Sequence, residues 1–485
     1  MSTQDMARSP TPASAPRSLR EAWIAFAGLS AVFLFEMLDN SILNVALPTI
    51  GRDLQASTTA LQWVTGAYAV VFGGLMLAFG AIADRFGRRR VMLVGLGLLG
   101  AASLATAFVG SAEQLIAVRA AMGVAAAMTT PGSMALAYRL FDDEQLRVRA
   151  ITLISTVGLV GLAVGPTVGG FVLAIAPWQV LLLVNVPIAA LAIIGIRYGI
   201  AADDPADLHR DPADIAGAVL GTAAIVSALV APTLFVNAGA GSWTPWAATT
   251  AAIAAATLFV LRERSAAHPL LDLKLVGHPL VASGLAFKAA AGLATAGLGY
   301  LVTLQLQFAW GWKPGLAALG LLPQVVVLIA GGAFVEPILR RVGPSRAAWL
   351  SAATVVAGLA VYGLFGRFGY VFVAIALALV AAGMRVVGVV AATNVLSGLP
   401  KSRTTIGAAL TDTATEVASG TGIAVAGTIL AALFTGSIAT PHWSAHQTAQ
   451  FQNALMVGGL TLTVTAATLT GWGIACVRRA DAARS

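Results

Sequence analysis

Long apolar stretches recur along almost the whole chain and constrain its fold more than any other feature. A helix that crosses a bilayer needs about 20 mostly apolar residues, and fourteen such stretches follow one another. Glycine and proline within them do not exclude spanning helices, because membrane helices tolerate both. The sequence therefore predicts an all-α integral membrane protein. The expected spans are 23–47, 62–82, 91–109, 115–138, 150–174, 179–200, 215–236, 246–261, 280–308, 315–336, 346–366, 370–396, 404–434 and 452–477.

The composition excludes an ordinary soluble protein. Of the 485 residues, 58% are hydrophobic and 10% are charged, whereas soluble domains carry about 25% charged residues. Residues 1–22 differ from the rest, because they are polar and rich in Pro, Ser and Arg. We expect them to form a disordered cytoplasmic tail.

Basic residues fall on alternate loops of the fourteen-span arrangement. All but six of the 29 Lys and Arg lie in tails, loops or helix ends on the side that carries both termini. The positive-inside rule places that side in the cytoplasm, so we expect a multi-pass protein of the cell membrane with both termini cytoplasmic. The net charge of +8 then orients the chain, and no nucleic-acid partner is expected. The six exceptions are Arg52, Lys313 and Arg367 outside, and Arg119, Lys288 and Arg385 within spans.

The first half contains four distinctive motifs. GAIADRFGRRR (80–90) is a short, charged turn between two spans, and GLAVGPTVGG (161–170) places glycines around a proline on one helix face. LDNSILNVALP (38–48) ends the first span, and Arg119 stands among small residues in the fourth. A bare glycine face permits close approach of a neighbouring helix, while proline kinks its own helix.

Together these motifs resemble the signatures of the major facilitator superfamily, and specifically of its fourteen-span drug:proton antiporters. The resemblance implies two six-helix bundles, at 23–200 and 280–477, separated by two additional central helices within 201–279 and followed by a tail at 478–485. A degraded copy of the 80–90 turn at 332–346 fits two bundles of shared ancestry.

The resemblance also implies roles for the motif residues. It assigns proton coupling to Asp39 and Arg119, and a conformational switch to the charged turn and the glycine-proline motif. The switch residues are Gly80, Asp84, Arg85, Gly87, Arg88, Gly161, Gly165, Pro166, Gly169 and Gly170.

Seven ionisable residues lie within predicted spans, where a charge costs at least about 2.5 kcal/mol. Burial favours the neutral form of a carboxyl group and a nearby cation favours the charged form. A carboxyl group under both influences binds and releases protons near neutral pH, which fits Asp39 beside Arg119. Glu36, one helical turn away, is a second candidate for a proton or a cationic substrate. The seven are Glu36, Asp39, Arg119, Lys288, Arg385, Asp412 and Glu416.

Asp412 and Glu416 share a helix face and are expected to line a substrate cavity. Two like charges in a dry helix require protons, a basic partner or a cationic ligand. The segment is similar to the matching span of exporters of quaternary ammonium compounds and dyes. Lys288 and Arg385 leave two alternatives, since they either neutralise these acids or face the cavity and favour an anionic or zwitterionic substrate. Four acids against three bases within the spans favour cations.

The sequence therefore predicts a proton-coupled exporter of small amphiphilic, cationic drugs or antibiotics. It is expected to be a monomer in the lipid bilayer, driven by the proton gradient without cofactor or metal. No catalytic His, Ser or metal-ligand constellation is evident, so an enzyme is not expected. The alternatives are a dedicated exporter of one antibiotic that protects its producer, and a non-transporting membrane sensor of the same fold.

Overall fold

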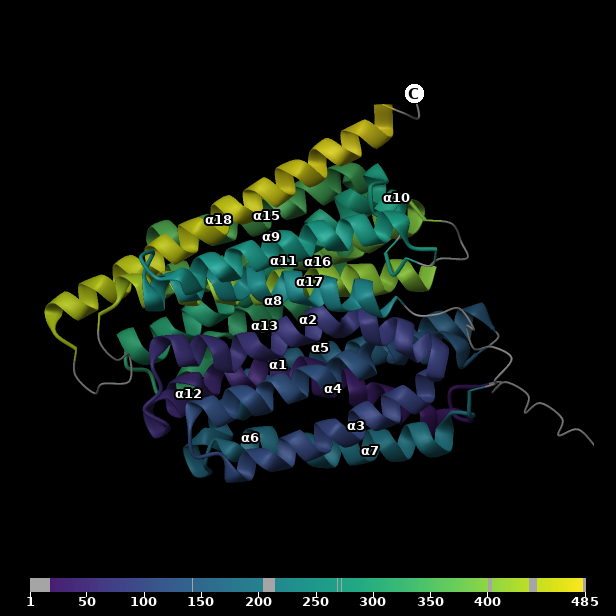
Figure 1. Cartoon of the computed structure of the whole chain (residues 1–485), viewed down its shortest axis with the longest axis horizontal. Coiled ribbons are helices and arrows are strands. Elements are labelled where there is room, and N and C mark those ends of the chain that lie inside the picture. The colour runs from purple at the N-terminus through teal and green to yellow at the C-terminus, as the bar shows by residue number, and fades with distance from the viewer. Residues whose placement is uncertain are drawn as a thin grey trace, which may run out of the picture.

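The protein is an elongated assembly of helices that run roughly side by side (Figure 1). A computed structural model describes residues 18–141, 143–203, 214–267, 269–271, 273–399, 404–435 and 443–482, and every regular element in these ranges is a helix. The predicted all-α class is confirmed. The helices of the first half are α1 (Trp23–Asp53), α2 (Thr58–Phe86), α3 (Arg88–Ala105), η1 (Thr106–Phe108), α4 (Ala112–Arg139), α5 (Glu144–Ile175), α6 (Gln179–Leu183) and α7 (Asn185–Gly199).

The remaining helices fall into a central pair and a second large group. The central part contains α8 (Ile215–Ala238), α9 (Trp243–Ser265) and the short α10 (Leu273–Val276). The second group contains α11 (Pro279–Leu304), the π-helical η2 (Gln305–Ala309), α12 (Pro314–Gly320), α13 (Leu322–Ala330), α14 (Gly332–Val342), α15 (Pro344–Phe365), η3 (Gly366–Phe368), α16 (Tyr370–Ser397), α17 (Thr404–Leu433) and α18 (Ala445–Ala482).

Among the described residues, 12 helices are long and apolar enough to cross a membrane, and two bent pairs raise the number to 14. One bend, of 41°, separates Thr156–Leu162 from Val164–Ile175, and the other, of 59°, separates Leu322–Ala330 from Gly332–Val342. The first lies beside Pro166, which has no N–H to complete the helical ladder. The second lies at Gly331 and Gly332, where a glycine pair weakens the helix. With each bent pair counted as one span, the number agrees with the fourteen predicted spans.

The helices pack mainly within two groups (Figure 1). In the first group α1 packs against α5 and α7, and α4 packs against α2 and α3. In the second, α11 packs against α16, α17 and α18, and α15 packs against α16 and α18. Contacts of α2 with α17 and of α5 with α12 and α13 join the groups. This packing agrees with two bundles, while the boundaries at 23–200 and 280–477 stay a prediction.

The helices α8 and α9 pack against each other at the side of this assembly. Only 17% of the α8 span and 6% of the α9 span are buried, so most of their surface faces outward. The Thr222 hydroxyl of α8 donates to the Gly74 carbonyl of α2 at 2.7 Å. Further along α8, the Thr233 hydroxyl lies 3.2 Å from Gln62 Nε2 of α2 and 3.4 Å from the Thr428 hydroxyl of α17.

The glycine face of α5 allows this helix to lie directly against α1. A Cβ added to Gly161 would come within 2.9 Å of the Leu34 side chain, and one added to Gly169 within 2.6 Å of Ile42. The Ser41 hydroxyl of α1 also donates to the Gly161 carbonyl at 3.4 Å. Gly170, on another face of α5, lies against Pro314 and Ala318 of α12. The motif therefore brings α5 into contact with both groups.

Both described ends of the chain lie at one end of the assembly (Figure 1). We call it the termini end, and we call the opposite end, which carries the loop at 54–57, the first-loop end. We propose that the termini end is cytoplasmic, because most basic residues belong to it.

Reporter fusions in bacterial cells test this orientation. Green fluorescent protein fused after Ser485 should fluoresce, whereas alkaline phosphatase at the same position should be inactive, because each reporter works on one side of the membrane only. A truncated fusion after Gly239, in the loop between α8 and α9, is the matched control and should give the reverse pattern. Fluorescence from the Gly239 fusion would contradict the proposed orientation.

Candidate functional site

A fully buried ion pair between α1 and α4 lies at the centre of the candidate site. Arg119 Nη1 donates to Asp39 Oδ2 at 2.5 Å, and neither side chain is accessible to solvent. The Asn185 side-chain amide of α7 donates to Asp39 Oδ1 at 3.0 Å. Both carboxylate oxygens of Asp39 therefore have a donor, which is what a buried charge requires.

Helix α2 holds the arginine in place. Arg119 Nε donates to the Val64 carbonyl at 3.2 Å, and the guanidinium carbon lies 4.5 Å from the centre of the Tyr68 ring. Such a cation–π contact stabilises the charge of a desolvated arginine. Gly123, one turn after Arg119 on α4, permits this arrangement, since a Cβ there would lie 2.7 Å from the Tyr68 carbonyl oxygen.

Glu36 belongs to a second group of charges that involves both halves of the chain. Its side chain is buried and accepts a hydrogen bond from the Thr130 hydroxyl of α4 at 3.1 Å. It also interacts electrostatically with Asp412 and Glu416 of α17. We call Glu36, Asp412 and Glu416 the acidic cluster.

Close packing of α17 on α2 brings the acidic cluster together. A Cβ added to Gly73 of α2 would lie 3.1 Å from the Val417 backbone nitrogen and 3.5 Å from the Glu416 carbonyl carbon. The Lys288 ammonium of α11 interacts electrostatically with Asp412 and Glu416, and all three side chains are half-buried. Within the described part of the chain, Lys288 forms no direct ion pair with either acid. The cluster therefore contains three acids and one nearby base.

The structure places Arg385 away from the acidic cluster. Its side chain lies against the bend between α13 and α14, where a Cβ added to Gly332 would come within 2.7 Å of a guanidinium nitrogen. Within the described residues, the base that interacts electrostatically with Asp412 and Glu416 is Lys288. Of the two bases considered from the sequence, Lys288 is the one beside the acids. A substrate contact by Arg385 stays a prediction.

The charged turn between α2 and α3 is held by interactions within the first half. Gly87 has a φ of +101°, which favours glycine, and Arg88 Nε donates to Asp84 Oδ1 at 2.7 Å. The Asp203 carboxylate, which follows α7, accepts from the backbone nitrogen of Arg89 at 3.1 Å and so caps α3. Arg85 is exposed and lies over the Phe86 ring. The switch role predicted for this turn is not tested by these contacts.

Side-chain hydrogen bonds join the two halves at the first-loop end. The Gln307 amide of η2 donates to the Val45 carbonyl of α1 at 2.9 Å. The Gln62 amide of α2 donates to the Ala424 carbonyl of α17 at 3.1 Å and to the Thr428 hydroxyl at 3.3 Å. Contacts of Gly170 with α12 lie at the same end. The described structure is therefore closed at the first-loop end.

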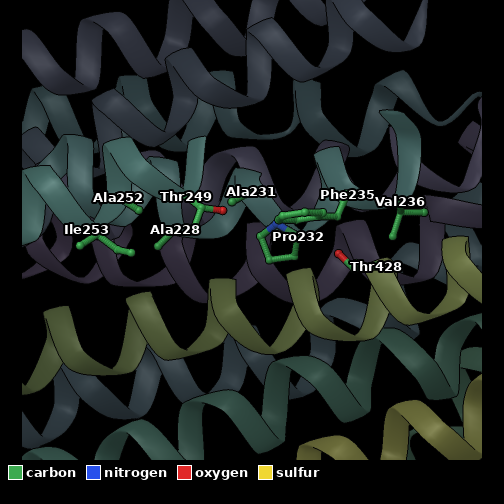
Figure 2. Close-up of a pocket in the computed structure, with 9 residues that line it drawn as sticks. All are labelled: Ala228, Ala231, Pro232, Phe235, Val236, Thr249, Ala252, Ile253 and Thr428. Carbon is green, nitrogen blue, oxygen red and sulfur yellow. The ribbon is translucent and has the colours of Figure 1, made fainter. Parts of the chain in front are cut away.

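A separate groove lies between α8, α9 and α17 (Figure 2). It has a volume of about 570 Å³, and none of its lining residues is charged. Pro232 and Phe235 form its centre, and Thr428 contributes a hydroxyl at one side (Figure 2). The groove contains none of the ionisable residues predicted from the sequence, so the candidate site is the ion pair with the acidic cluster.

Several residues of this site could not be predicted from the sequence. Three of them contact the predicted charged residues from other helices, namely Asn185, Thr130 and Tyr68. No motif in the sequence marks these residues as functional. A polar side chain within a span is the one signal they share. Asp203 has no such signal, because its partner is set by the return of α7 to the start of α3.

Comparison with known proteins relates the chain to membrane transporters. The family model described as Major Facilitator Superfamily matches residues 29–423. The multidrug efflux pump LfrA of Mycolicibacterium smegmatis is 31% identical, with 88% of this chain and 84% of the relative covered. The methyl viologen resistance protein SmvA of Salmonella typhimurium is 28% identical over 86% and 84%. The methylenomycin A resistance protein of Streptomyces coelicolor is 29% identical over 84% and 85%.

Solved structures share the fold at low sequence identity. A bacterial homologue of the human lysosomal transporter Spinster, in an inward-facing and unoccupied conformation, has a TM-score of 0.68 and 14% identity over 95% of this chain and 98% of its own. The POT family transporter PepTSo has a TM-score of 0.64 and 14% identity over 94% and 99%.

The buried ion pair makes a prediction about stability. Replacing Arg119 by Met should lower the free energy of unfolding by about 3–5 kcal/mol, because it leaves the Asp39 charge buried without a cation. Adding Asp39→Asn should restore most of the loss, since the remaining charge is then gone. Thermal unfolding of the detergent-solubilised protein measures both effects.

The exposed pair of Arg340 with Glu336 provides the control, since both side chains are more than two-thirds accessible. Arg340→Met should change stability by no more than about 1 kcal/mol. If the double variant unfolds at the same temperature as Arg119→Met, the uncompensated charge is not the cause of the loss.

Proposed function

This chain belongs to the major facilitator superfamily, and we propose that it is a proton-coupled exporter of small amphiphilic cations. As a member of this family it is a multi-pass membrane transporter of small molecules rather than an enzyme, and it is related to multidrug and antibiotic efflux pumps. The observation that carries the proposal is the position of the buried Asp39–Arg119 pair next to an acidic cluster to which both halves contribute.

The charge of the acidic cluster favours a cationic substrate. Glu36, Asp412 and Glu416 face one another with Lys288 as the nearby base, so the cluster is negative when its acids are ionised. A bound cation would relieve the repulsion among these carboxylates. One relative is named for resistance to methyl viologen, which is a dication. An amphiphilic cation therefore fits both the charges and the relatives.

Competition between protons and the cation supplies the coupling. Protonation of the acidic cluster removes the field that holds the cation. Protonation of Asp39 adds a second effect, because it leaves the Arg119 guanidinium uncompensated and a positive charge nearby repels the cation. Proton uptake from outside thus favours release, and proton loss to the cytoplasm favours binding.

Alternating access would expose this site to one side at a time. The halves are joined at the first-loop end, while the hydrogen bonds described for the 80–90 turn stay within the first half. With the termini end in the cytoplasm, this arrangement is closed toward the outside. We infer that Asp84 and Arg85 exchange their present neighbours for contacts with the second half when the cytoplasmic side closes.

A dedicated antibiotic exporter is the second candidate. Relatives include proteins named for resistance to lincomycin and methylenomycin A, at 31% and 29% identity. Lys288 beside Asp412 and Glu416 would suit a substrate that carries both signs of charge. Survival of cells that express the protein, on a panel of such antibiotics, separates this candidate from a general cation exporter.

Asp39→Asn tests the proton coupling. The variant should lose proton-driven efflux of ethidium by at least about tenfold, because the amide is neutral and cannot exchange a proton. Ethidium fluorescence in cells without other pumps, with and without an uncoupler, measures the efflux. Efflux by Asp39→Asn at the wild-type rate would move the coupling to another acid.

Glu113→Gln is the matched control for this experiment. Glu113 is an exposed carboxylate near the first-loop end and lies outside the proposed site. Its loss should leave efflux unchanged at equal expression. If wild-type protein at full expression gives no efflux of ethidium, the cationic proposal is wrong and the antibiotic candidate takes its place.

Glu416→Gln tests the acidic cluster as the cation site. The half-saturating concentration of methyl viologen should rise by about tenfold, the equivalent of about 1.4 kcal/mol. The monocation ethidium should be affected less, since it depends on fewer carboxylates. Transport into inverted vesicles, at equal expression, provides both values. An equal effect on both substrates, or none, would contradict a charge-based cation site at Glu416.

A further inference from the structure

Tyr68 occupies a position between the two groups of charges described above. It lies on α2, is fully buried, and its ring packs under the Arg119 guanidinium and beside Phe72. Its hydroxyl has no hydrogen-bond partner within the part of the chain that the structure describes. A buried hydroxyl without a partner lowers stability relative to phenylalanine. A tyrosine at this position is therefore explained best by a bond that forms in another state.

The charges around the hydroxyl come from three helices. Asp39 and Glu36 face it from α1, Arg119 from α4 and Glu416 from α17, and each interacts with it electrostatically. Three of these groups are carboxylates and accept hydrogen bonds, and a tyrosine hydroxyl donates one. Tyr68 thus has acceptors in both groups of charges, Asp39 in the ion pair and Glu36 and Glu416 in the acidic cluster.

The two halves supply these acceptors differently. Asp39 and Tyr68 both belong to the first half, whereas Glu416 belongs to α17 of the second half, which packs directly on α2 beside Gly73. When the halves rock against each other, the distance from Tyr68 to Glu416 must change more than the distance to Asp39. The choice of acceptor by the Tyr68 hydroxyl therefore depends on how the two halves are positioned.

Building on the proposed function, we propose that the Tyr68 hydroxyl couples the ion pair to the acidic cluster. Unpartnered in the described state, it donates its hydrogen bond to Glu416 or to Asp39 in other states of the transport cycle. Protonation of Asp39 then changes the affinity of the acidic cluster for a cation through this hydrogen bond as well as through the electrostatic field. Tyr68 is a positioning residue in this scheme, and its proton stays on the hydroxyl.

Binding of tetraphenylphosphonium to the purified, full-length protein tests the proposal. Between about pH 5.5 and about pH 8.5, wild-type Kd should rise by up to about tenfold for each unit that the pH falls, as for one competing proton. In Tyr68→Phe this rise should shrink to about threefold or less, with the Kd at the highest pH within about threefold of wild type. The ring under Arg119 is retained in this variant, so folding should be preserved.

Tyr300→Phe is the matched control, because Tyr300 of α11 is also fully buried with an unpartnered hydroxyl. Unlike Tyr68, it has no electrostatic interaction with a charged group among the described residues. Its variant should bind with the wild-type pH dependence. In an Asp39→Asn background, Tyr68→Phe should cause no further flattening, since the two changes interrupt the same link.

Three results would overturn the inference. A wild-type pH dependence in Tyr68→Phe would show that charge alone couples the sites, while proton-driven ethidium efflux would keep the proposed function intact. An equal loss of affinity at every pH, with a lower unfolding temperature, would assign Tyr68 a structural role. Wild-type binding without pH dependence, together with absent efflux, would overturn the proposed function and this inference with it.

Discussion

The cost of charge in a membrane is the constraint on which this structure depends. An ionised carboxylate within a span is stable only with a cation and hydrogen-bond donors around it. Asp39 obtains these from three other helices, since Arg119 lies on α4, Asn185 on α7, and α2 braces Arg119 through Val64 and Tyr68. Four helices of the first half are therefore tied to the state of one acid.

The acidic cluster extends this dependence to the second half. Glu36 is satisfied by Thr130 within its own half, yet the acids that interact with it electrostatically lie on α17. The packing of α2 against α17 around Gly73 joins the halves beside these acids. A change in the charge of one acid therefore alters the electrostatic interactions of both halves at the α2–α17 contact, which must move during transport. Charge and conformation are linked at the same place.

The sequence predicted those features that are local or carried by a recognisable motif. The apolar stretches gave the helices, including the two that bend, because about 20 apolar residues suffice to define a span. The motifs located the glycine face of α5 and the turn at Gly87. Hydrogen-bond partners on distant helices could not be predicted from the sequence, since Asn185 lies 146 residues from Asp39 and Thr130 lies 94 residues from Glu36. The position of Arg385 depends likewise on how α13 bends against α16.

The hydrogen bonds of α8 have a mechanical consequence. This helix is bonded to α2 at three levels, through Thr222 to Gly74, Thr233 to Gln62 and Asn237 to Thr59, but to α17 at one level, through Thr233 to Thr428. When the halves separate, α8 and α9 should move together with the first half, and α17 should shift relative to them. Because α17 lines the apolar groove together with α8 and α9 (Figure 2), the width of this groove should then change in each transport cycle.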